Sequence, residues 1–148
     1  MQYNYNHIFL ENRQISNTSA IRWSCFTAMV IGIAWIFTLF HIISVPALAF
    51  QIIAPVSIFI LLLPAVVNHL MHLSDILLVG SKGINLLTGL ILGCNLTAVF
   101  LLSSTLSHYT SIIWLLPALI ACQYYSRRIT SHIFWGGLAG MILSFYAS

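Results

Sequence analysis

Long runs of apolar residues alternate with short polar segments along the whole chain. The runs are unbroken, whereas the strands of membrane β-barrels alternate apolar and polar residues, so the pattern predicts α-helices. A helix needs about 20 apolar residues to cross a hydrocarbon core of about 30 Å. We therefore predict an all-α, polytopic transmembrane helical bundle of about five spans, with four spans as the alternative. The expected spans are residues 23–45, 47–67, 84–103, 109–125 and 129–147.

Polar and proline residues set the expected boundaries of these spans. Residues 1–22 are rich in Asn and Tyr and are expected to form a polar N-terminal cytoplasmic tail, ahead of a transmembrane domain over residues 23–148. Pro46 should end the first span, because proline disfavours helical conformation in the residue before it. Pro55 and Pro64 lie inside the second run and predict a kinked helix. The first apolar run exceeds the length of a signal-peptide core, so we expect it to stay in the mature protein.

The composition shows that lipid must be the main solvent of this chain. Hydrophobic residues make up 60% of the sequence and charged residues 5%, whereas an ordinary soluble protein is about a quarter charged. With five basic residues, the chain cannot build the stripe of cations that nucleic acid binding requires, so nucleic acid is excluded as a partner. The two acids, Glu11 and Asp75, and the lack of any catalytic sequence motif make an enzyme the less favoured class.

The basic residues also predict an orientation. In a five-span chain with the N-terminus inside, all of them fall on the cytoplasmic side, as the positive-inside rule requires. The C-terminus is then outside. The simple charge pattern favours a bacterial inner (cytoplasmic) membrane, with an organellar inner membrane as the alternative. The residues concerned are Arg13, Arg22, Lys82, Arg127 and Arg128.

Pairs of small residues four positions apart recur in three of the expected spans. In lipid, where burial of apolar surface between helices contributes little, such notches let two backbones approach closely. We expect two notches to pack inside the bundle and one to remain available for a partner helix or a second copy of the chain. The pairs are Ala28 with Gly32, Gly89 with Gly93, and Gly136 with Gly140.

Histidines near the expected inner boundary are candidate ligands. A haem b in a helical bundle takes two imidazoles from different helices at one depth, and His132 with His69 or His72 could supply them. His69, His72 and Asp75 also follow one another at steps of three, so neighbouring pairs could share a metal ion. The alternative is that histidines at membrane boundaries simply place a polar tip at the interface.

Transport is a further hypothesis. Pro55 and Pro64 interrupt one helix, and Asn95 places an amide inside the third, as occurs in transporter sites. No ionisable residue lies at the expected midplane, and interhelical hydrogen bonding would explain the polar residues as well. The other polar residues of the third span are Asn85, Thr88 and Thr97.

The three pairs of small residues suit helix packing, and few residues could carry out catalysis. These two observations favour one function over the others. The preferred hypothesis is a non-enzymatic accessory subunit that binds other membrane protein subunits, or itself, within the lipid bilayer. The alternatives are a haem b-binding electron-transfer anchor, a small-solute transporter or channel, and a membrane immunity or exclusion factor.

Overall fold

In a computed structural model, the described part of the chain is almost entirely helical. The structure describes residues 2–42, 47–74 and 81–105, together with residues 120, 124, 131, 133–140 and 142. It holds three long helices, α1 (Gln2–Leu39), α2 (Ala47–Ser74) and α3 (Ser81–Ser103), and none of the residues it describes forms a strand. The predicted all-helical class is therefore confirmed, and each of the three helices is long and apolar enough to cross a membrane.

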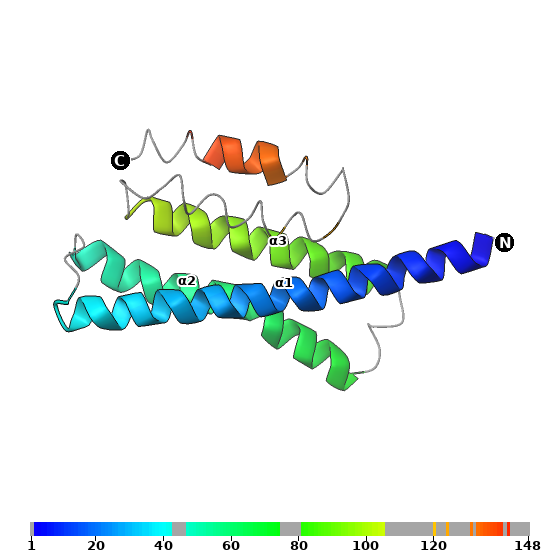
Figure 1. The fold of residues 1–148 in the computed structure, drawn as a ribbon, viewed down its shortest axis with the longest axis horizontal. Coiled ribbons are helices and arrows are strands. Elements are labelled where there is room, and N and C mark those ends of the chain that lie inside the picture. Colours follow the sequence, from blue (N-terminus) through cyan, green and yellow to red (C-terminus); the bar gives the residue numbers. More distant parts are fainter. Residues whose placement is uncertain are drawn as a thin grey trace.

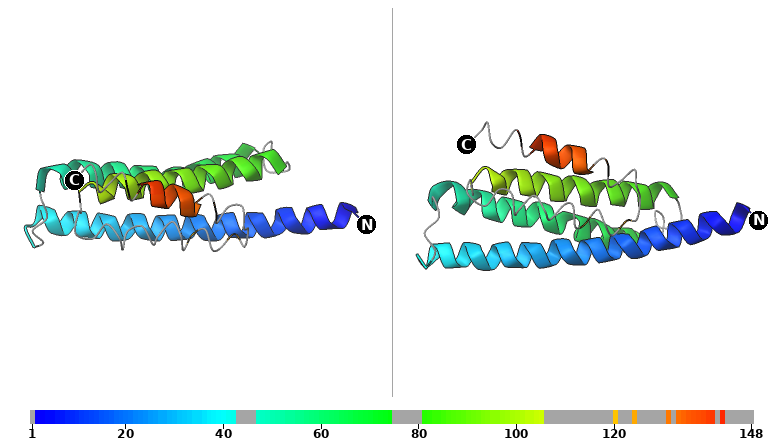
Figure 2. Two further views of the ribbon diagram at one scale, coloured as in Figure 1. Left: turned by 90° about the horizontal axis from the view of Figure 1, so that it is seen from above. Right: turned by 45° about the horizontal axis from the view of Figure 1, so that its top comes forward.

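The three helices lie side by side (Figures 1 and 2). α1 and α3 run in the same direction, and α2 runs in the opposite direction and packs against both. A short helical segment over residues 133–140 lies beside α3. Of the expected fourth span, 109–125, the structure describes residues 120 and 124. Of the expected fifth span, 129–147, it describes residues 131, 133–140 and 142, and the rest of both spans lies outside the described residues.

α1 is longer than a membrane crossing requires. Its 38 residues correspond to about 57 Å at a rise of 1.5 Å per residue, against a hydrocarbon core of about 30 Å. The expected N-terminal tail is helical from Gln2 and continuous with the first apolar run, because this stretch has no proline and its one glycine, Gly32, comes late. Figure 1 shows the N-terminal end of α1 projecting beyond α2 and α3.

The boundaries of α2 and α3 differ from expectation mainly at the end of α2. Pro55 and Pro64 both lie within one continuous helix, and its C-terminal part slants away from α1 in Figure 1. Residues 68–74, which lie beyond the expected end of the second span at residue 67, continue α2. They contain neither glycine nor proline, and Met71 among them is buried against the bundle. α3 begins close to its expected start.

α1 ends at Leu39, before the position that Pro46 suggested, in a Schellman cap. The amide of Ile42 donates to the carbonyl of Phe37 over 3.0 Å, and the amide of His41 donates to that of Thr38 over 3.1 Å. His41 takes a φ of 57° in this cap, a conformation that costs a residue with a Cβ atom about 1–2 kcal/mol.

The cap leads to a prediction for His41. His41→Gly should raise the free energy of unfolding by about 0.5 kcal/mol, because the relief of left-handed strain exceeds the extra entropy of glycine in the unfolded chain. His69→Gly, at an exposed helical position of α2, should lower it by up to about 1 kcal/mol. Thermal unfolding in detergent measures both variants, and a loss of stability in His41→Gly would contradict the role of the cap.

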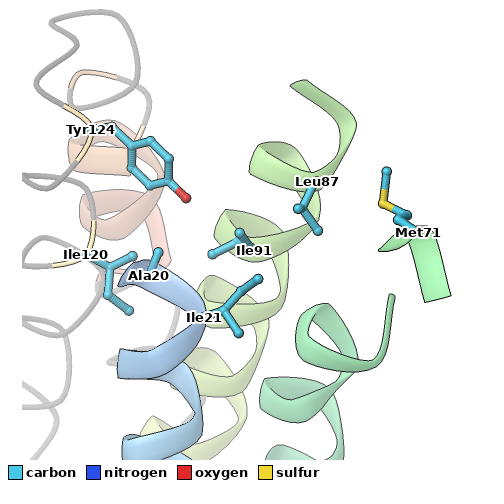
Figure 3. Packing of buried hydrophobic residues seen from close by; sticks show 7 residues of the cluster. All are labelled: Ala20, Ile21, Met71, Leu87, Ile91, Ile120 and Tyr124. Atoms are coloured by element: carbon cyan, nitrogen blue, oxygen red, sulfur yellow. The ribbon is translucent and has the colours of Figure 1, made fainter. Parts of the chain in front are cut away.

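The buried apolar side chains of the described residues form three small clusters along the bundle. The largest joins α1, α2 and α3 to the C-terminal region, and Figure 3 shows the Tyr124 hydroxyl pointing toward α1 and α3. Many large apolar side chains are exposed on the described helices, as expected for helices whose outer faces contact lipid. The clusters comprise Ala20, Ile21, Met71, Leu87, Ile91, Ile120 and Tyr124; Ala28, Leu61 and Ala98; and Phe50, Ala54 and Leu102.

Candidate partner-binding site

A buried asparagine of α1 connects three parts of the bundle. Asn17 is only 2% exposed. Its Oδ1 accepts hydrogen bonds of 2.9 Å from the hydroxyl groups of Thr88 and Tyr124, and its Nδ2 donates to the carbonyl of Ile84 over 3.3 Å. Asn17 therefore holds α1 to α3 and to Tyr124. It lies in the segment that the sequence predicts to be a polar cytoplasmic tail.

A second polar contact repeats the first further along the same two helices. Nδ2 of Asn95 donates to Oγ of Ser24 over 2.9 Å and to the carbonyl of its own helix at Ile91 over 2.8 Å. Both Asn95 and Ser24 are buried. The Ser24 hydroxyl in turn donates to the carbonyl of Ala20 over 3.0 Å.

The two contacts have a common spacing, and we call them together the polar ladder (Asn17 with Thr88, and Ser24 with Asn95). Residues seven apart on an α-helix lie on nearly the same face, two turns from each other. Both partners in α1 and both in α3 have this spacing, so the ladder fixes α1 and α3 in parallel register.

Arg13 extends the contact between α1 and α3 toward the N-terminal end of α3. Its guanidinium donates a hydrogen bond to Oδ1 of Asn85 and lies 5.3 Å from the centre of the Phe9 ring. Asn85 and the neighbouring Lys82 are both exposed. The N-terminal half of α1 and the start of α3 thus lie at the same end of the bundle.

The polar residues that suggested a transport site have structural partners. Asn85, Thr88 and Asn95 bond to α1 as described, and the Thr97 hydroxyl donates to the carbonyl of Gly93 over 2.8 Å. The bonds of Asn85, Thr88 and Asn95 to α1 are interhelical, which was the alternative to transport, whereas the Thr97 bond lies within α3. The signal that could have revealed the ladder was the shared spacing of seven residues in two different helices.

Two of the three small-residue notches face other helices of the same chain. Ala28 is buried in a cluster with Leu61 and Ala98, and a Cβ added to Gly32 would lie 3.7 Å from Cδ1 of Ile58. The notch in α1 therefore packs against α2.

The notch in the last helical segment faces α3. A Cβ added to Gly136 would lie 3.6 Å from Cδ1 of Leu96, and Gly140, one turn further on, is half-buried. This notch lets the segment over residues 133–140 approach α3 closely.

The third notch, on α3, is open. A Cβ added to Gly89 or Gly93 would meet no atom of the described residues within 4 Å, and both glycines are exposed. Thr97 is exposed one turn further along the same face. We call Gly89, Gly93 and Thr97 the open notch. Leu86, 64% exposed, and Phe100, 38% exposed, flank it.

The predicted haem and metal ligands are described only in part. His69 and His72 lie exposed near the C-terminal end of α2, whereas Asp75 and His132 lie outside the described residues. Within the described ranges, no group of three or more His, Cys, Asp or Glu residues is placed to hold a metal ion.

Comparison of the chain with family models, with curated proteins and with solved structures gave no match. The physical arrangement of the helices is accordingly the basis for a functional proposal.

Proposed function

We propose that this protein is a non-enzymatic membrane subunit that binds a transmembrane helix of another membrane protein through the open notch of α3. The observation that carries the proposal is a difference between the notches. Gly32 and Gly136 face side chains of the same chain, whereas a Cβ at Gly89 or Gly93 would meet nothing within 4 Å in the part of the chain that the structure describes. The open notch is thus a packing surface for which the described residues supply no helix.

The physics of helix association in lipid supports this role. Lipid tails are as apolar as leucine, so helices associate through van der Waals contacts, and glycines four apart let two backbones come close enough to make many of them. Leu86 and Phe100 stand as exposed ridges at the two ends of the notch. The Thr97 hydroxyl oxygen can accept a hydrogen bond from a polar side chain of the partner, since its proton is donated to Gly93.

The proposed setting is a bacterial inner membrane, with five spans, the N-terminus inside and the C-terminus outside. Arg13 bonds to Asn85 near Lys82, so the described cations at the starts of α1 and α3 lie at one end of the bundle. One shared cytoplasmic face for these cations is what the positive-inside rule requires.

The test substitutes a large side chain for a glycine of the open notch. After crosslinking in membranes and purification in mild detergent, the wild-type chain should bring down a defined membrane partner. Gly93→Leu should reduce its recovery at least about tenfold, because the added bulk keeps the two backbones apart. Its helix content should match the wild type and its thermal stability should be equal or slightly higher, since the site is open and leucine is favoured over glycine in a helix.

Ala49→Leu is the matched control, because it adds similar bulk at an exposed position of α2. It should leave recovery of the partner unchanged. Equal recovery with Gly93→Leu and with the wild type would reject the open notch as the binding surface. A monodisperse wild-type monomer without crosslinked partners would reject the function itself, and a homo-oligomer disrupted by Gly93→Leu would identify the partner helix as a second copy.

A further inference from the structure

The polar ladder sets the depth of Arg22 in the bundle. Each of its two contacts joins a residue of α1 to the residue of α3 whose number is 71 higher, so Arg22 is level with Gly93. Gly93 lies about 15 Å from one end of α3 and about 18 Å from the other, which is the middle of a crossing of about 30 Å. The sequence predicts Arg22 just before the first span, so this depth follows from the register alone.

Arg22 belongs to a line of exposed residues along α1. Ile15, Arg22, Met29 and Ile36 are seven residues apart, so they lie on nearly the same face of the helix. All four are exposed, the apolar three by 45% or more. Most helices in membranes pack at the shallow angle that is typical of seams with this spacing. We call these four residues the α1 seam, an apolar packing surface that one cation interrupts.

No described residue supplies a carboxylate close to Arg22. The acids of the chain are Glu11 and Asp75. Glu11 lies about 16 Å from Arg22 along the axis of α1, and Asp75 lies outside the described residues. None of the hydrogen bonds or ion pairs between described residues involves the Arg22 guanidinium. The described part of a second copy in the same orientation offers no closer acid, so the counter-charge must come from a different protein.

An unpaired guanidinium at this depth would be costly in lipid. Charged side chains within membrane-spanning segments almost always face a bundle interior and pair with an opposite charge. Because Arg22 is exposed, such an interior forms around it only when another helix packs on the α1 seam. A single polar residue in an apolar seam also specifies the register in which a partner helix packs. The α1 seam therefore calls for a carboxylate at one defined depth.

We propose that the α1 seam binds a transmembrane helix of another membrane protein, and that this helix carries an aspartate or glutamate level with Arg22. The guanidinium donates two hydrogen bonds to the carboxylate, and the apolar residues of the seam contact apolar side chains of the same helix. The inference rests on the proposed function, because it specifies the chemistry of such a partner. It concerns α1, whereas the open notch belongs to α3, so separate substitutions test the two surfaces.

Model transmembrane peptides test the proposal. The purified full chain, with a donor dye at its N-terminus, is reconstituted in phosphatidylcholine vesicles with leucine-rich helices of about 22 residues. These peptides carry an acceptor dye and have glutamate, glutamine or lysine at the centre, and energy transfer measures their association. The wild type should bind the glutamate peptide about tenfold more tightly than the glutamine peptide. Arg22→Leu should remove this preference, and Arg22→Glu should transfer it to the lysine peptide.

Lys82→Gln is the matched control, because it removes an exposed cation from the start of α3 and should keep the preference. Gly93→Leu should also keep it, so failure of the open notch and failure of the α1 seam give different results. Matching circular dichroism of Arg22→Leu and the wild type ensures that the loss of preference reports on binding.

Four results would overturn the proposal. Equal binding of the glutamate and glutamine peptides to the wild type would show that no carboxylate pairs with Arg22. Loss of the preference in Lys82→Gln would assign it to overall charge. Loss on addition of phosphatidylglycerol would assign the seam to an anionic lipid. Self-association of the wild type that disappears in Asp75→Asn would assign the carboxylate to a second copy of the chain.

Discussion

Replacement of Asn17 by leucine is expected to lower the free energy of unfolding by about 2–3 kcal/mol. Asn17 makes hydrogen bonds to Thr88, Tyr124 and the carbonyl of Ile84. Single interhelical hydrogen bonds in membrane proteins average about 0.6 kcal/mol, but this substitution removes three together. Thr88 keeps its bond of 2.9 Å to Ile84, whereas the buried Tyr124 hydroxyl loses the acceptor that Asn17 supplies.

The measurement is reversible unfolding of the purified protein in mixed micelles, with Tyr124→Phe and the double variant included. If Asn17 and Tyr124 act through their shared hydrogen bond, Tyr124→Phe should destabilise the wild type by about 1 kcal/mol and the Asn17→Leu variant hardly at all. Among the described residues, the Thr18 hydroxyl bonds only to Gln14 of its own helix, so Thr18→Val should change stability by less than about 0.5 kcal/mol. Strictly additive effects of the Asn17 and Tyr124 substitutions would show that the bond does not hold the helices together.

The helices themselves could be predicted from the sequence because each depends on a local property. The apolar runs anticipated α2 and α3 to within a few residues at most ends, since length and hydropathy suffice to identify them. The end of α1 could not be read in this way. Pro46 indicated where a helix must have stopped, but the cap at His41 closes it earlier, and a histidine in a left-handed conformation has no clear sequence signal.

The buried role of Asn17 depends on tertiary packing and was not visible locally. In a polar segment an asparagine looks solvated, and only its alignment with Thr88 in a parallel neighbour gives it a partner. The notches show the same limit. Their spacing identified three packing surfaces, but which of them stays open depends on where Ile58 and Leu96 lie relative to the glycines. The spacing of residues in the sequence predicts which face of a helix packs, but it does not predict which other helix packs against that face.

The other large effect on stability is expected at the notch in α1. Added bulk should lower the free energy of unfolding at Ala28 but not at Gly32. Ala28 is 3% exposed and packs between Leu61 and Ala98. Ala28→Leu adds three carbon atoms where no space exists, and overpacking of this kind costs about 1–3 kcal/mol. It should also separate α1 from α3 one turn from the bond between Ser24 and Asn95, so we expect a loss of at least about 2 kcal/mol.

Gly32→Ala is the matched substitution on the same face of α1. The new Cβ would lie 3.7 Å from Cδ1 of Ile58, which is an ordinary van der Waals distance, and alanine is favoured over glycine in a helix by about 1 kcal/mol. This variant should therefore be as stable as the wild type or slightly more stable in the same unfolding measurement. A tolerated Ala28→Leu together with a destabilising Gly32→Ala would mean that α1 and α2 meet in a different register. The two variants change stability in opposite directions only if Ala28 fills its site completely while Gly32 leaves room for one methyl group.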